Sequence, residues 1–179
     1  MEELIARYGL IAIFVGSGME GEPFALAGGV FAHRGWLSPY AVALTVIAGA
    51  FCIDQFWFNL SRNFRQTRLV GKMMGRPTFA RAFGLIERHP ILFILLFRFA
   101  YGLRAVAAVA IGVSQVPRRQ VVLLNLAAAS VWGLLYTGLG YALGPAFKRL
   151  EGQFGIGFTI LSIGLSALAL FLIIRRRRH

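Results

Sequence analysis

Residues 16–29 read GSGMEGEPFALAGG and place two carboxylates, Glu20 and Glu22, inside an otherwise apolar part of the chain. A helix that faces lipid should not carry them, because a charged side chain at the centre of a bilayer is costly. The surrounding glycines and Pro23 favour a turn or a broken helix, and such a bend lets both carboxylates point into one cavity. The simpler alternative is that they cap a helix that begins at Pro23, a residue favoured at a first helical position.

The composition is that of a membrane protein. The chain has 179 residues, of which 58% are hydrophobic and 15% charged, whereas a soluble domain typically has about 25% charged residues. The net charge is +12, and the basic residues gather at the ends of apolar segments, as on the cytoplasmic flanks of membrane helices. This placement argues against a nucleic-acid partner. One cysteine, Cys52, excludes an internal disulfide and a Cys-based zinc site, and we expect no metal and no cofactor.

Four apolar segments are predicted to be membrane helices, at about residues 4–16, 39–60, 121–144 and 153–174. They belong to a single integral membrane domain over residues 1–179. The first is barely long enough to cross a bilayer and begins with acids rather than a basic region, so we expect it to be retained rather than cleaved as a signal peptide.

Two further apolar stretches, residues 20–34 and 90–113, carry charges and glycines at their middles. Irregular backbone at membrane depth is tolerated only where protein or a water-filled cavity surrounds it, so both stretches are predicted to be re-entrant hairpins. The basic connector at about 61–88 and the tail RRRRH are expected to be cytoplasmic. The hairpins then enter from opposite faces. The predicted fold is an all-α polytopic membrane protein with an inverted repeat, an arrangement found in transporters whose substrate site lies near the midplane.

The second hairpin contains two arginines, Arg98 and Arg104, separated by Gly102. An intramembrane arginine costs at least about 2.5 kcal/mol on insertion scales, so two of them need partners. The chain has seven acids, and those away from segment ends and connectors are Glu20, Glu22 and Asp54. We therefore predict that these acids face the two arginines near the membrane midplane. The alternative is a set of ion pairs that only holds the hairpins together.

Two other polar residues lie within predicted spans. Asp54 is a candidate for the charged cluster, and a helix-end ion pair with Arg62 is an equally good interpretation. Asn125 is expected to hydrogen-bond to a hairpin or, alternatively, to hold two helices together. The tryptophans, including Trp132, suit interfacial or bundle packing and are assigned no chemistry.

The motifs at these positions resemble the DedA family, which is defined by a VTT (SNARE-associated) domain, over about residues 8–144. The resemblance rests on GMEGEPFALAGGVFAHRGWLS (18–38), close to the EGE subtype, and on DQFWFNLSR (54–62). It also rests on FRFAYGLRAVAAVAIG (97–112) and NLAAASVWGLLYTGLGYALG (125–144).

The resemblance implies a multi-pass protein of the bacterial inner membrane that translocates lipids, with a cytoplasmic C-terminus following from the basic tail. Recycling of undecaprenyl phosphate, phospholipid scrambling and dependence on proton-motive force all occur among relatives. The family's acidic positions fall on Glu20, Glu22 and Asp54, and its arginines on Arg98 and Arg104. The chain departs from the family pattern at three positions, where glycine, glycine and proline are replaced by Ile53, Ser61 and Ala108. The last replacement is expected to straighten the second hairpin.

These observations predict a lipid transporter or flippase for a phosphate-bearing lipid. Arg98 and Arg104 would bind the phosphate, because guanidinium groups bind phosphate through two parallel hydrogen bonds. Glu20 and Glu22 would compete for the arginines, and Asp54 and Asn125 would support the site or couple it to protons. The alternatives are a proton or ion antiporter and a passive phospholipid scramblase. An enzyme is not expected, since the sequence has no His-rich or Asp-rich motif; the expected partners are membrane lipids.

Overall fold

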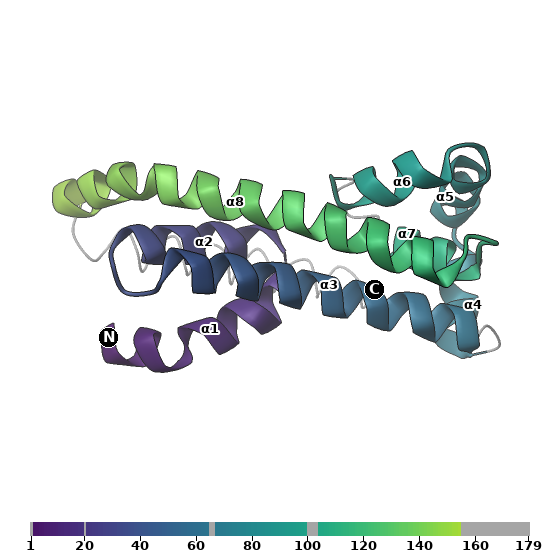
Figure 1. The fold of residues 1–179 in the computed structure, drawn as a ribbon, viewed down its shortest axis with the longest axis horizontal. Coiled ribbons are helices and arrows are strands. Elements are labelled where there is room, and N and C mark those ends of the chain that lie inside the picture. Colours follow the sequence, from purple (N-terminus) through teal and green to yellow (C-terminus); the bar gives the residue numbers. More distant parts are fainter. Residues whose placement is uncertain (1, 20, 65–66, 100–103, 155–179) are drawn as a thin grey trace.

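The computed structural model describes residues 2–19, 21–64, 67–99 and 104–154. Every element within these ranges is helical, which confirms the predicted all-α class for this part of the chain (Figure 1). The helices are α1 (Glu2–Met19), α2 (Glu22–His33), α3 (Pro39–Asn63), α4 (Arg68–Met74), α5 (Pro77–Arg88), α6 (Pro90–Leu96), the 3₁₀ helix η1 (Phe97–Phe99), α7 (Arg104–Val113) and α8 (Arg118–Phe154).

Two of the described helices, α3 and α8, are long and apolar enough to cross a membrane. The predicted span at 39–60 corresponds to α3, which extends to Asn63. The predicted span at 121–144 lies within α8, but α8 continues to Phe154 through a stretch that was expected to be a connector. The predicted helix at 153–174 lies outside the described residues, apart from its first two positions.

Helices α3 and α8 run antiparallel and form the framework of the molecule (Figure 1). At one end, Arg118 at the start of α8 donates a hydrogen bond to Asn63 at the end of α3. The pair α1–α2 lies along the other half of this framework, and α6–α7 lies along the half near Arg118 (Figure 1). The start of α2 and the start of α7 therefore lie close together near the middle, with Gly21 next to Arg104.

The stretch 20–34, predicted to be a re-entrant hairpin, contains the single helix α2, and the predicted span at 4–16 corresponds to α1. The pair α1–α2 is called the first helical hairpin below and the pair α6–α7 the second, and each contacts both long helices. Helix α1 packs on α3 and α2 on α8, whereas α6 packs on α8 and α7 on α3. Backbones approach closely at small residues. A methyl group at Gly140 of α8 would collide with the Leu26 carbonyl of α2, and one at Gly112 of α7 would collide with Ser61 of α3. Ser61, which replaces a glycine of the family pattern, is thus accommodated by a glycine opposite it.

The corner between α2 and α3 is fixed by a left-handed glycine. Gly35 has φ 77°, a conformation that glycine adopts without a steric penalty. Its N–H donates to the Ala32 carbonyl and the Trp36 N–H to the Phe31 carbonyl, the two bonds of a Schellman motif. The rings of Phe31 and Trp36 stack with centroids 5.6 Å apart. These contacts turn the chain sharply from α2 into α3.

The basic connector forms α4 and α5. Helix α5 is amphipathic, with Phe79, Ala82 and Ile86 buried and Arg81 and Arg88 exposed. Its apolar face packs on α7, so this helix covers the second hairpin.

The core consists of two apolar clusters that share α3. One cluster contains Val42, Val46 and Ala50 together with Ile13 and Trp132. The other gathers residues of the second half of the molecule around Phe58, Phe97 and α7. Asp54 lies on α3 between these two groups and is 1% exposed. A buried carboxylate therefore separates the two apolar clusters.

Candidate functional site

Asp54 pairs with both arginines of the second hairpin. One of its carboxylate oxygens lies 2.5 Å from Nη2 of Arg98, and the other accepts a 3.3 Å hydrogen bond from Nε of Arg104. The side chains of Asp54 and Arg98 are each 1% exposed and that of Arg104 is 22% exposed. Helix α3 thus supplies one carboxylate for two guanidinium groups that lie on either side of the α6–α7 turn.

Arg98 also joins the second hairpin to both long helices. Its Nη2 donates to Oδ1 of Asn125 on α8 at 3.0 Å and to the Ala50 carbonyl on α3 at 3.2 Å. Asn125 is fully buried. Of the two interpretations of Asn125, the contact with a hairpin is therefore confirmed.

The indole of Trp132 lies beside both cations. The guanidinium carbons of Arg98 and Arg104 are 5.8 and 5.6 Å from its ring centroid, within the range of a cation–π contact. Trp132 was expected to serve only in packing. Trp132 follows Asn125 by seven residues, or about two helical turns, and therefore lies on the same face of α8. This spacing is the sequence signal that places Trp132 beside the charged cluster.

Several buried donors of this cluster have no hydrogen-bond acceptor among the described residues. They are Nε and Nη1 of Arg98, Nη2 of Arg104, Nδ2 of Asn125 and Nε2 of Gln55. An unsatisfied buried polar group costs about 1–3 kcal/mol, and more when it is charged. Among the described residues the cluster therefore has more donors than acceptors, an arrangement that suits an anion.

The first hairpin reaches the same place through its backbone. Gly21, with φ 77°, lies so close to Arg104 that a Cβ built on it would be 3.1 Å from Nη1. Glu22 is half-buried in the first turn of α2, where a carboxylate interacts favourably with the helix dipole. Within the described residues, both ion pairs of the arginines go to Asp54 rather than to Glu22. Glu20 lies outside these residues, as does Gly102.

The alternative ion pair between Asp54 and Arg62 is wrong. Arg62 instead donates to the carbonyls of Gly112, Ser114 and Val116 at 2.9, 3.2 and 2.8 Å. These bonds tie the end of α3 to the segment that leaves α7. On a helix with 3.6 residues per turn, Arg62 is rotated about 80° from Asp54 and lies farther along the axis, so the two side chains serve different contacts.

Helix α7 runs without a break through Ala108, where many relatives of the resembled family have proline. Ala108 is fully buried, in a run of buried residues from Val106 to Val113. A proline in a helix interior would remove a backbone hydrogen bond. Alanine here allows α7 to remain helical from Arg104 onward.

Comparison with known proteins identifies the family. The model of the VTT domain matches residues 19–142, a region that includes every residue of the charged cluster. The chain is 39% identical to the inner membrane protein YohD of Escherichia coli (strain K12) over 144 residues, which cover 80% of this chain and 75% of that protein. It is 30% identical to an uncharacterized membrane protein, slr0232, of Synechocystis over 167 residues, covering 80% of this chain and 71% of the relative. No solved structure matches it. The chain is therefore a membrane protein of the DedA family, with the VTT domain as its core.

Proposed function

We propose that this protein transports a phosphate-bearing lipid across the membrane and that Arg98 and Arg104 bind the phosphate. The observation that carries the proposal is the excess of buried donors: two guanidinium groups share one carboxylate, Asp54, and retain N–H groups without acceptors in the described structure. A phosphate offers several acceptor oxygens, and charge-assisted hydrogen bonds to it are the strong ones.

Stability alone accounts poorly for this cluster. A buried ion pair is often no more stable than apolar residues of similar volume, because both charges must be taken out of water. Apolar residues already fill the interior on both sides of Asp54. In our proposal Asp54 holds the arginines in place when no lipid is bound, and the phosphate competes with it for their N–H groups.

The proposal includes re-entrant hairpins related by an inverted repeat. Each hairpin has one helix on α3 and the other on α8, with the roles of the long helices exchanged between α1–α2 and α6–α7. Three of the four hairpin helices, α2, α6 and α7, have 12, 7 and 10 residues, too short to cross about 30 Å of hydrocarbon, which takes about 20. The fourth, α1, has 18 residues. With the basic connector facing the cytoplasm, the two hairpins would open to opposite sides of the bacterial inner membrane.

Proton coupling is assigned to the acids at the turn of the first hairpin. Glu22 follows Gly21, which lies against Arg104. Protonation of Glu22 or Glu20 would remove a negative charge near the phosphate site and favour binding of the anion. An antiporter using the same acids is the second candidate function, and it predicts ion flux in liposomes that needs no particular lipid.

The test is movement of undecaprenyl phosphate and of a plain phospholipid in proteoliposomes, with and without a proton gradient. Wild type, Glu22→Gln and Arg104→Lys are compared at equal protein density. We expect the polyprenyl phosphate to move in response to the gradient and Arg104→Lys to reduce this movement. Equal movement of both lipids without a gradient would instead indicate a scramblase. Folded protein that moves neither lipid but conducts ions would favour the antiporter.

A further inference from the structure

A row of amides lies on the membrane-spanning helix α3, beyond the charged cluster. Gln55, Asn59 and Asn63 follow one another at four-residue intervals, which places them along one face. Gln55 is half-buried and the other two are exposed. Polar side chains within membrane spans are costly and commonly mark a substrate or ion pathway. These three residues are called the amide row below.

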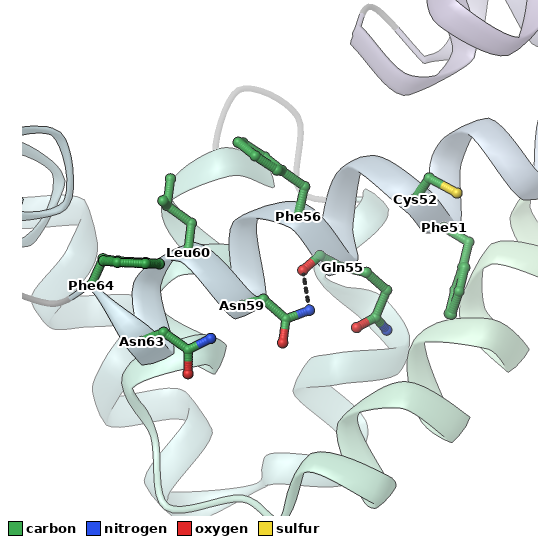
Figure 2. Close-up of a pocket in the computed structure, with 8 residues that line it drawn as sticks. All are labelled: Phe51, Cys52, Gln55, Phe56, Asn59, Leu60, Asn63 and Phe64. Carbon is green, nitrogen blue, oxygen red and sulfur yellow. Dashed lines mark hydrogen bonds between the residues drawn. The ribbon is translucent and has the colours of Figure 1, made fainter.

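The amide row lines an open cavity on the surface of α3. The cavity has a volume of about 450 Å³, and within the described part of the chain it is lined by residues 51–64 alone, the three amides and several aromatic residues among them. Figure 2 shows the three amides pointing to one side of α3, with Phe56 and Leu60 projecting in another direction from the same stretch of helix. A second cavity, of about 20 Å³, shares Gln55 and Asn59 and adds Arg118 of α8. The polar side of the row therefore faces the seam between α3 and α8.

The row extends from the level of the charged cluster to Arg118 at the start of α8. At its inner end Gln55 is adjacent in sequence to Asp54, and its buried Nε2 has no acceptor in the described structure. At its outer end Oδ1 of Asn63 accepts a 2.6 Å hydrogen bond from Arg118, which is followed by the exposed Arg119. At about 1.5 Å per residue, Asp54 and Asn63 are about 13 Å apart along the helix axis. That is almost half of the roughly 30 Å hydrocarbon core.

We infer that the amide row is the path along which the lipid headgroup passes between the Arg118 end of the molecule and the central arginines. This inference rests on the proposed function. Cations at both ends attract an anionic headgroup, and the amides replace part of its hydration on the way. The aromatic and aliphatic residues beside the row, such as Phe56, suit the hydrocarbon chain, which stays in the lipid. The occupant is thus a membrane lipid with a phosphate headgroup.

Accessibility to water is the first test. In protein with Cys52→Ala, the variants Asn59→Cys and Leu44→Cys are reacted in membranes with a charged, membrane-impermeant maleimide added on the Arg118 side. Leu44 lies on the same helix, is 68% exposed and does not line the cavity. We expect Asn59→Cys to react at least tenfold faster. Equal, slow rates of the two variants would overturn the inference. The same result is expected if another part of the chain fills the cavity, which would also overturn it.

Transport is the second test, with Asn59→Leu as the variant. Asn59 donates a hydrogen bond to the Gln55 carbonyl four residues earlier in its own helix. Ser130→Ala is the matched control, because Ser130 makes the same kind of bond to Leu126 on α8, away from the cavity. We expect Asn59→Leu to lower the rate of phosphate-lipid movement about tenfold and Ser130→Ala to leave it unchanged.

The outcomes separate this inference from the proposed function. If wild type moves the phosphate lipid and Asn59→Leu moves it equally fast, the amide row is not the path of the headgroup, whereas the proposal that the arginines bind phosphate is unaffected. A wild type that moves no phosphate lipid overturns both. Both are supported if undecaprenyl phosphate in the vesicles slows the reaction of Asn59→Cys with the maleimide and if Asn59→Leu transports the lipid slowly.

Discussion

The two helical hairpins lie at opposite ends of the same pair of long helices, yet they are held there differently. Hairpin α1–α2 meets α8 through small residues, with Gly140 directly against the Leu26 carbonyl. Hairpin α6–α7 also has a close contact with α3 at a small residue, Gly112 against Ser61, but adds ion pairs from Arg98 and Arg104 to Asp54. The first arrangement depends on shape, whereas the second depends on shape and charge. This difference supports our proposal that the second hairpin binds the anion, while Gly21 of the first hairpin lies against Arg104.

The largest effect is expected when the charge of Arg98 is removed. We expect Arg98→Met to lower the free energy of unfolding by about 3–5 kcal/mol, because Asp54 then loses its closest partner. Lipid movement should be lost as well. The double variant Arg98→Met/Asp54→Leu should recover most of the stability, measured by thermal unfolding in detergent, but not the transport. Transport by the double variant would show that the pair is only structural.

The contact of the first hairpin is tested by adding one methyl group to α8. Gly140→Ala places it against the backbone of α2, and overpacking of this kind costs about 1–3 kcal/mol. Gly138→Ala, two residues away, meets no atom within 4 Å and should gain up to about 1 kcal/mol from helix propensity. Thermal unfolding of the two variants should therefore shift in opposite directions. A neutral Gly140→Ala would mean that α2 and α8 do not meet as described.

Arg104 allows binding to be separated from stability. Its side chain is 22% exposed and makes one 3.3 Å bond to Asp54, so Arg104→Lys should change the unfolding free energy by less than about 1 kcal/mol. The loss of a charge-assisted bond to phosphate is about 1.5–3 kcal/mol, or roughly tenfold or more in apparent affinity. Titration of transport against lipid concentration measures this. Unchanged affinity would remove Arg104 from the phosphate site.

The smallest effect is expected at Glu22. Glu22→Gln loses only a favourable position at the start of α2, which amounts to about 0.3–1 kcal/mol. Movement of phosphate lipid without a gradient should stay within twofold of wild type, whereas the response to a proton gradient should weaken. A variant that responds normally to the gradient would place the coupling acid elsewhere.

The sequence predicted the residues of the cluster better than their pairings. The cost of charge in a membrane identified Arg98, Arg104 and Asp54, since so few acids remain after the segment ends are set aside. It could not choose among those acids, because the choice depends on how α3 is rotated against α7 and α8. The small residues Ala50 and Ser61, which lie close to the face of Asp54 on a helix of 3.6 residues per turn, were the available signal for that rotation.

The sequence also predicted the middles of the long helices better than their ends. The apolar pattern found the cores of α3 and α8, whose hydrophobic residues repeat over many turns. It missed the continuation of α8 beyond residue 144, because the polar stretch there has no apolar periodicity and contains Pro145. The apolar pattern also missed the contact of Trp132 with the two arginines, because an aromatic residue in a membrane span is commonly part of the packing. The position of Trp132 two turns after Asn125 indicates this contact.

The partition of contacts between α3 and α8 has a consequence for biosynthesis. Helix α2 has its most extensive contacts with α8, but the ribosome makes roughly 85 further residues after His33 before it reaches Arg118. At about 5–20 residues per second this takes about 4 to 17 s. Crosslinking of stalled nascent chains from α2 would show whether it changes neighbours when α8 emerges. During that interval α2 has α1 and α3 as neighbours but lacks α8. An insertion intermediate of this protein must therefore keep a half-packed, glycine-rich helix in the membrane until its main partner is made.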